Sequence, residues 1–229
     1  MKHVFSMLLV LGLVTPCCAQ PNTLPELVEW AKKELPRIQA VKGYMAVFTA
    51  IEQINGNSKT SIALVKVRHE PFAVYMLYLS PPLERGREVM YREDAGSRFW
   101  VKEPRLRTVF LSINSPLVKK HTRYPITDFG VANLAKKLIE VGEKEQYTPG
   151  LSVKRTRVSV EGAVCNKYTI ERQNLKVVLY VDEERSLPVR YDCWQDGVLM
   201  ESYRYSKIKF TTFSDKDFDT RNQEYHFRR

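Results

Sequence analysis

The chain has 229 residues, of which 44% are hydrophobic and 11% aromatic, so it can bury the core of one domain of ordinary size. Its net charge of +10 favours anionic partners, such as phospholipid headgroups or acidic proteins. Beyond the first apolar stretch, no run approaches the ~20 residues that a membrane span requires, which excludes a membrane-spanning body.

The first 19 residues have the pattern of a secretory signal peptide. Lys2 and His3 precede an apolar run at Val4–Val14, and small residues end the segment at positions 17–19. The run is too short for a membrane span and is typical of a cleaved signal. We therefore expect export to the periplasm, and export argues against nucleic acid as the partner of the basic surface.

Cys17 or Cys18 could instead be the lipid-attachment residue of a bacterial lipoprotein. Such a cysteine follows a leucine-like residue three positions earlier and a small Gly, Ala or Ser directly before it. Neither cysteine fits, because Pro16 precedes the first and a cysteine precedes the second. Cleavage after Ala19 is therefore expected and leaves a soluble protein that begins at Gln20, with a lipid-anchored form as the alternative.

An amphipathic helix opens the mature chain. Its apolar residues recur at helical spacing: Leu24, Leu27, Val28, Ala31, Leu35 and Ile38. Asn22 or Thr23 can cap the helix, Pro25 suits its first turn, and Pro36 can kink it. A helix with one apolar face needs a surface to cover.

Six strands are expected next. They cover residues 44–54, 60–68, 72–79, 88–92, 98–102 and 107–113. Asn55-Gly56 predicts a tight hairpin turn between the first two, because both residues tolerate positive φ. Pro71 interrupts the pattern before the third strand, since proline removes a donor from the hydrogen-bond ladder.

The pattern then becomes helical over about residues 115–147. Ser115-Pro116 predicts a helix start, and an apolar stripe follows from Val131 to Val141. Gly142 and Gly150 are expected to close this insertion.

Five more strands are expected in the last third of the chain. They cover residues 153–160, 164–171, 175–182, 188–194 and 198–210, with turns at Glu161-Gly162 and Asp196-Gly197. A charged tail over about residues 214–229 is expected to be frayed. Residues 20–229 therefore read as one α+β domain of about ten or eleven antiparallel strands.

Several of these strands are apolar on both faces. One face must then meet the helices, while the other meets a second layer; alternatively an internal cavity is kept open for a ligand.

The layout resembles the LolA/LolB lipoprotein-carrier superfamily, and more closely a bacterial family of LolA-like domains of unknown function. The resemblance covers residues 24–218 and depends on three segments. Residues 62–72 have a strand, a basic residue, a proline and an aromatic; residues 88–101 resemble the next hairpin, and residues 180–205 the closing strands. It implies a strongly curved, incomplete barrel whose concave face is covered by the helices, and a non-catalytic carrier of acyl chains.

The resemblance also implies site residues. Arg68 matches a basic residue that helps control closing of the lid in the carriers, although His69 and Glu70 separate it from Pro71. Bulky apolar residues on the central strands are candidate ligand-lining positions: Phe48, Phe72, Tyr75, Leu77, Trp100, Phe110, Leu179 and Tyr203. The expected ligand is a lipid, a lipoprotein acyl chain or another hydrophobic molecule, with an anionic membrane surface as a further partner of a monomer. The alternative for each lining residue is an ordinary packed core position.

No catalytic signature accompanies this pattern. His69, His121 and His226 are far apart in the sequence, and there is no G-x-S-x-G elbow, phosphate-binding glycine loop or C-x-x-C pair. Cys165 and Cys193 fall on the first and third strands of a meander, about 10 Å apart, too far for a disulfide. We expect no enzyme activity, no cofactor and no metal. An envelope interaction or sensor module with a packed, ligand-free interior is the alternative function.

Overall fold

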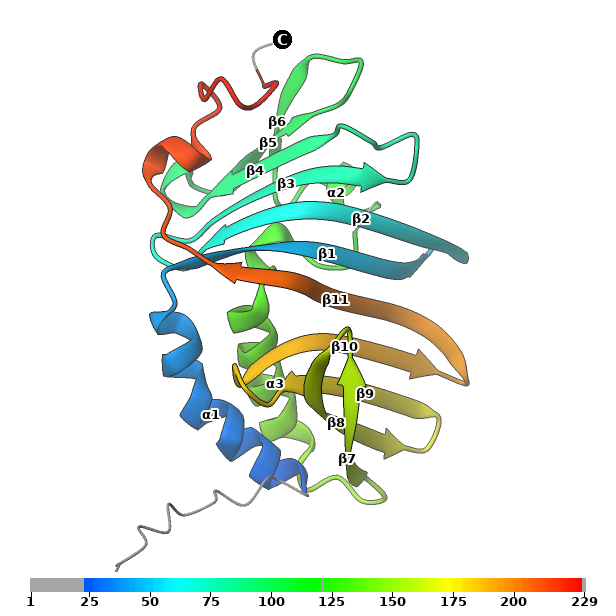
Figure 1. The fold of residues 1–229 in the computed structure, drawn as a ribbon. Coiled ribbons are helices and arrows are strands. Elements are labelled where there is room, and N and C mark those ends of the chain that lie inside the picture. Colours follow the sequence, from blue (N-terminus) through cyan, green and yellow to red (C-terminus); the bar gives the residue numbers. More distant parts are fainter. Residues whose placement is uncertain (1–22, 121, 228–229) are drawn as a thin grey trace, which may run out of the picture.

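The computed structural model describes residues 23–120 and 122–227. Its described residues form one antiparallel sheet of 11 strands in the order β6-β5-β4-β3-β2-β1-β11-β10-β9-β8-β7. The sheet curves without closing, and two helices lie side by side beneath its concave face (Figure 1). This is the α+β architecture that the sequence predicts.

The strands follow the expected ranges to within a few residues. They are β1 (Gly43–Ile54), β2 (Asn57–Arg68), β3 (Ala73–Ser80), β4 (Glu88–Arg92), β5 (Arg98–Lys102), β6 (Thr108–Ser112), β7 (Ser152–Val160), β8 (Ala163–Arg172), β9 (Leu175–Asp182), β10 (Leu187–Gln195) and β11 (Val198–Phe210). Two meanders, β1–β6 and β7–β11, meet where β1 pairs with β11. The first and last strands of the chain thus join the two halves of the sheet.

The first helix, α1 (Leu24–Ala40), has a complete capping box. Thr23 Oγ1 accepts from the Glu26 backbone N–H at 3.3 Å, and the Glu26 carboxylate accepts from the Thr23 N–H at 3.3 Å. These two bonds satisfy backbone donors that the first turn of a helix leaves free. The apolar face predicted from the sequence is the buried one, with Leu27, Val28 and Ala31 each 0 to 1% exposed.

The helical insertion contains α2 (Pro116–Lys119), a short 3-10 turn η2 (Ile126–Asp128) and α3 (Val131–Glu145). Gly142, expected to end the insertion, lies inside α3 instead. A Cβ at this position would lie 2.3 Å from Val28 Cγ2, so the glycine lets α1 and α3 approach closely. Its role is therefore packing between the helices and not helix termination.

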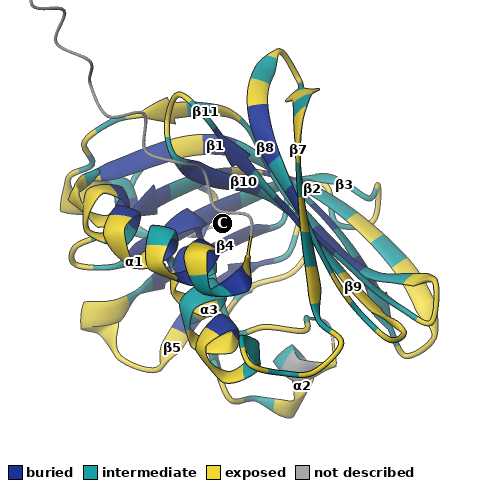
Figure 2. Cartoon of the chain, turned by 90° about the horizontal axis from the view of Figure 1, so that it is seen from below, coloured by how far each residue is buried: buried dark blue, intermediate teal, exposed yellow. Residues whose placement is uncertain are grey.

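The two faces of the sheet bury different sets of residues. Side chains alternate along a strand, so Val65 and Val67 of β2 pack under the sheet with Val131 and Ala135 of α3. We call this helix-covered side the concave face. The opposite, convex face holds Ala73, Tyr75 and Met90. Figure 2 shows buried residues on the inner sides of the helices and along the strands above them.

The C-terminal segment is packed and not frayed as expected. A short 3-10 turn, η3 (Asp215–Phe218), is followed by Tyr225 and Phe227, and these three aromatic side chains are 1 to 6% exposed. The Tyr225 ring stacks on Tyr75 with centroids 4.2 Å apart, on the convex face. Figure 1 shows the segment, in orange to red, running past β3 and β4. The prediction of a frayed tail was wrong because it was based on the many charged residues of the segment, whereas the few aromatic residues between them determine its packing.

Several expectations concern residues that the structure does not describe. Another concerns two cysteines that were expected not to form a disulfide. The signal peptide over residues 1–19, Cys17, Cys18 and His121 lie outside the described residues. Cys165 on β8 and Cys193 on β10 are free, with β9 between them. Within the described residues, no helix has the length and apolar character needed to cross a membrane.

Candidate functional site

A cavity of about 860 Å³ lies between the concave face, α3 and the segment of residues 117–130. Its lining is mainly apolar. The sheet contributes Phe48, Met76, Phe99 and Leu179, and α3 contributes Leu134 and Leu138. Concave apolar cavities of this size are the usual form of small-molecule sites.

Small side chains on the central strands keep the cavity open. Ala50 of β1 and Ser61 of β2 are register partners, and both line the cavity. Tyr203 of β11 lies on the other side of Ala50 and also lines it. Since neither alanine nor serine can reach across to α3, volume remains beneath the middle of the sheet.

A network of charges lies at one edge of the cavity, where β2, β4 and β5 meet the loops. Glu84 Oε1 pairs with Lys59 Nζ at 2.8 Å and with the Arg87 guanidinium at 3.1 Å, and Arg87 Nε pairs with Glu103 at 2.7 Å. Arg87 also lies over the Tyr78 ring, 5.5 Å from its centroid. Burial raises the pKa of Tyr78 to about 12. Lys59 and Arg87, the cations of this edge, are therefore both engaged by carboxylates.

Two buried glutamates face each other across the seam between β1 and β11. Glu52 and Glu201 are register partners and are 8% and 2% exposed. Glu201 accepts from the Tyr124 hydroxyl at 2.9 Å and the Tyr191 hydroxyl at 3.1 Å, and it pairs with Arg123 Nε at 2.9 Å. Glu52 accepts from the Tyr203 hydroxyl at 2.7 Å. We call Glu52, Glu201 and these three tyrosines the glutamate–tyrosine cluster.

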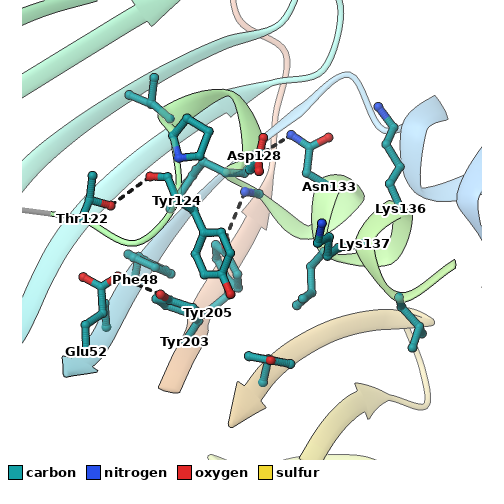
Figure 3. A pocket seen from close by; sticks show the side chains of 18 of the residues that line it. Phe48, Glu52, Thr122, Tyr124, Asp128, Asn133, Lys136, Lys137, Tyr203 and Tyr205 are labelled. Carbon is teal, nitrogen blue, oxygen red and sulfur yellow. Dashed lines mark hydrogen bonds between the residues drawn. The ribbon is translucent and has the colours of Figure 1, made fainter. Parts of the chain in front are cut away.

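Figure 3 shows how this cluster meets the cavity: Glu52, Tyr203 and Tyr124 lie together, and Phe48 is beside them. Tyr124 is 39% exposed, so this end of the cavity reaches the surface. The cavity thus has a polar mouth at the cluster and an apolar part beside Leu134 and Leu138. Its lining on α3 also includes charged side chains, namely Lys136, Lys137 and Glu140.

The polar groups of the cluster are hydrogen-bond donors and acceptors, not activated nucleophiles. Burial first, and then Glu52 or Glu201, raises the pKa values of Tyr203, Tyr191 and Tyr124, so all three phenols stay protonated at neutral pH. Burial also raises the pKa of Cys193, which disfavours the reactive thiolate. Among the described residues, no group of three His, Cys, Asp or Glu side chains is arranged to hold a metal ion.

A family model described as "Protein of unknown function (DUF1571)" matches residues 41–227. The chain belongs to this family. The match spans all 11 strands and the helical insertion, so the cavity is part of the DUF1571 domain. No curated protein matches the sequence.

Solved structures show where the DUF1571 fold recurs. An uncharacterized conserved protein from Thermus thermophilus is 12% identical with a TM-score of 0.50, over 85% of this chain and 91% of that one. The lipoprotein LppX from Mycobacterium tuberculosis is 14% identical with a TM-score of 0.50, over 82% of this chain and 98% of that one.

A LolA superfamily protein from Nitrosomonas europaea is 14% identical with a TM-score of 0.40, over 82% of this chain and 97% of that one. The expected resemblance to a family of unknown function is confirmed by the DUF1571 match, and the fold recurs in the LppX structure. At these identities the likeness concerns the fold alone.

The DUF1571 structure brings three of the predicted lining residues together. Phe48, Leu179 and Tyr203 all line the cavity. Phe72 instead lines a separate pocket of about 220 Å³, near His69 and Tyr91.

The other predicted residues lie on the convex face. Tyr75, Leu77 and Trp100 pack around Phe218 and the C-terminal aromatics, and Trp100 stacks on Phe110 at 4.7 Å. Alternation explains this placement, since Met76 and Tyr78, one residue out of phase, are the ones that line the cavity. The sequence of a strand that is apolar on both faces does not reveal which of its two sets of alternate residues lines the cavity.

Arg68 also lies on the convex face, away from the cavity. Its guanidinium pairs with Asp215 at 2.7 Å, donates to the Pro71 carbonyl at 2.9 Å and lies 5.2 Å from the Phe218 ring centroid. These contacts hold the C-terminal segment against the sheet.

The polar part of the site was not predicted from the sequence. On the cavity side of β1, Glu52 follows Phe48 and Ala50. On the cavity side of β11, Glu201 precedes Tyr203 and Tyr205. A carboxylate in a row of apolar or aromatic alternate positions was the available signal. The pairing of these two glutamates joins β1 to β11, two strands from opposite ends of the sheet-forming chain, and it requires the strand order of the whole sheet. The stripe of α3, by contrast, was predicted, and its Leu134, Leu138 and Val141 line the cavity.

Proposed function

We propose that this DUF1571 protein is a non-catalytic binding protein that holds a lipid, an acyl chain or another hydrophobic ligand in its concave cavity. The observation that supports this is the apolar space of about 860 Å³ between the sheet and α3. Burial of about ten methylene groups would contribute about 8 kcal/mol, enough for firm binding without any reactive group.

Three further observations support a binding role. The phenols at the mouth are held in their neutral form, and the thiol of Cys193 is disfavoured as a thiolate. Leu134 and Leu138 of α3 give the same space an apolar wall. An interaction module with a packed interior, the alternative hypothesis, does not account for the cavity.

Cavity binding can be tested by native mass spectrometry of gently purified protein, which should show a co-purifying lipid, and by uptake of a fluorescent fatty acid. Ser61→Trp should fill the cavity, because Ser61 lines it and is half-buried, and should reduce uptake by at least about tenfold, or about 1.4 kcal/mol. Thr60→Trp is the matched control, since its side chain points to the opposite face of the same strand and is exposed.

Equal uptake by the Ser61→Trp and Thr60→Trp proteins would place the ligand elsewhere. An apo mass, together with no uptake of either a fatty acid or an uncharged long-chain alcohol by the native protein, would contradict the proposed function itself.

We propose further that residues 20–229 act as one soluble, monomeric periplasmic domain after cleavage of the signal. The basic surface would favour contact with anionic membranes. The mass of the mature N-terminus is the test: Gln20 as first residue is expected, and a diacylated Cys17 or Cys18 would mean a membrane anchor.

A further inference from the structure

Glu52 is a buried carboxylate that lines the cavity and has no ion-pair partner among the described residues. Its side chain is part of the lining, and the residue is 8% exposed. Oε1 accepts from the Tyr203 hydroxyl at 2.7 Å and from the Arg123 backbone N–H at 3.4 Å. No described residue donates a hydrogen bond to Oε2. A buried carboxylate that is not in an ion pair is costly, so this carboxylate gains from a cation that enters the cavity.

The nearest cations of the protein are engaged elsewhere. Arg123 pairs through Nε with Glu201 at 2.9 Å and donates through Nη1 to the Gln53 carbonyl. Lys59, the register partner of Glu52, pairs with Glu84. At the glutamate–tyrosine cluster, two carboxylates thus face one guanidinium.

Aromatic rings surround the same end of the cavity. The Tyr203 ring is nearly parallel to the Phe48 ring, with centroids 6.0 Å apart and an interplanar angle of 12°, and to the Tyr191 ring, at 6.3 Å and 12°. Tyr124 meets Tyr203 edge-on at 6.0 Å and 71°. Figure 3 shows Tyr203, Tyr124 and Phe48 close to Glu52. The faces of such rings attract cations, most strongly where water is excluded.

We propose that the ligand of this cavity is an amphiphile whose head group carries an ammonium charge. The head group pairs with Glu52 among the rings of Tyr203 and Tyr124, and the hydrocarbon chain lies in the apolar part toward α3. The proposal rests on the proposed function and adds the chemical class of the head group. At this end of the cavity an anionic head would meet the Glu52 carboxylate, and a neutral head would leave Glu52 without an ion-pair partner. Two lysines of the lining, Lys136 and Lys137, lie on α3.

The net charge of the protein opposes the binding of cations, so it cannot account for a preference for an ammonium head group. At a net charge of +10, long-range electrostatics disfavour cations and favour anions. A preference for an ammonium head group would therefore have to come from the local site.

The test compares three amphiphiles of equal chain length, dodecylammonium, dodecanol and dodecyl sulfate, by calorimetry at pH 7 and below their micellar concentrations. Dodecylammonium should bind at least about tenfold more tightly than dodecanol, which corresponds to about 1.4 kcal/mol, and dodecyl sulfate should bind most weakly. In Glu52→Gln the affinity ratio of dodecylammonium to dodecanol should fall to about one.

Glu161→Gln is the matched control. It makes the same change in net charge, but Glu161 lies at the β7–β8 turn, is paired with Arg204 and does not line the cavity. Its affinity ratio should equal that of the native protein. If Glu52→Gln does not fold, nuclear Overhauser contacts from the N-methyl protons of dodecyltrimethylammonium to the Tyr203 ring of the native protein decide the question.

The outcomes separate this inference from the proposed function. Binding of dodecanol and dodecylammonium with equal affinity overturns the inference alone, as does an ammonium preference that persists in Glu52→Gln or an absence of contacts to the Tyr203 ring. Failure of all three amphiphiles to bind overturns the proposed function as well.

Discussion

The two faces of the sheet are packed differently: the concave face borders a cavity, and the convex face is covered by the C-terminal segment. Along β3, Met76 and Tyr78 face the open cavity, whereas Tyr75 and Leu77 pack beneath the C-terminal segment. The strand supplies apolar side chains to both faces, so its composition does not explain the difference. What differs is the cover: α3 leaves space beneath the concave face, while the aromatics of residues 218–227 fill the convex one.

The charges follow the same division. On the convex face, Arg68 pairs with Asp215, and the buried Glu88 pairs with His226 at 2.6 Å. On the concave face, Glu201 pairs with Arg123, but its register partner Glu52 has no ion pair among the described residues. This difference fits the proposed function, in which the convex face stabilises the fold and the concave face binds a ligand.

The largest expected effect on stability comes from removing an aromatic ring, which can be done on each face in a separate variant. Phe218→Ala should lower the free energy of unfolding by about 3–5 kcal/mol, because Phe218 is 1% exposed and leaves a cavity behind. Phe129→Ala should cost less than half as much, since the half-buried Phe129 already borders open space. Urea denaturation measures both, and equal losses would mean that the faces are equally well packed.

A second test concerns Arg68, which the family resemblance assigns to the ligand site. Arg68→Ala should lower the free energy of unfolding by about 2 kcal/mol, because it removes a buried hydrogen-bonded charge, while fatty-acid affinity stays unchanged. Arg204→Ala, which breaks an exposed pair with Glu161, should cost about 0.5 kcal/mol. A loss of ligand affinity in Arg68→Ala would show that the convex face communicates with the cavity.

One tyrosine on each face allows the loss of a hydroxyl group to be compared between the faces. Tyr225→Phe on the convex face removes a hydroxyl that accepts from Lys66 at 3.0 Å and donates to the Asp217 carbonyl at 2.6 Å. It should cost about 1–2 kcal/mol, against about 0.5–1 kcal/mol for Tyr124→Phe, which removes one bond to Glu201 at the exposed mouth.

Hydrogen exchange should separate these two tyrosines further. Tyr124→Phe should speed exchange in residues 122–130, and Tyr225→Phe in residues 215–227. Unchanged exchange at the mouth in Tyr124→Phe would show that Arg123 alone holds that segment.

The smallest expected effect is a pH dependence through His69. Burial, assisted by the charge of Lys136, lowers the pKa of His69, although backbone groups at the end of α1 oppose the shift. The unfolded chain then takes up a proton near pH 6.5 while the folded protein resists it, so stability falls as the pH drops below about 6.5. Urea midpoints at pH 7.5 and 5.5 should differ less in His69→Gln than in the native protein; an identical difference would exclude His69 as a contributor.

The helices and strands and their order along the chain follow from local sequence patterns. Hairpin signals such as Asn55-Gly56 and Asp196-Gly197, the alternation of apolar residues and the capped amphipathic pattern after Thr23 are local, and local patterns are set by backbone preferences that do not depend on distant residues. The antiparallel meanders, the position of α3 and its apolar stripe follow from them.

Which apolar residues face the cavity depends instead on tertiary packing. Side chains with the same character occupy both sides of β3, so the choice between Tyr75 and Met76 depends on what packs against each face. Whether the charged C-terminal segment packs or frays could not be predicted for the same reason. Its three buried aromatic side chains become buried only because they pack on the convex face. The pairing of Glu52 with Glu201 arises from the junction of the first and last strands, a contact between distant parts of the chain that no local pattern specifies.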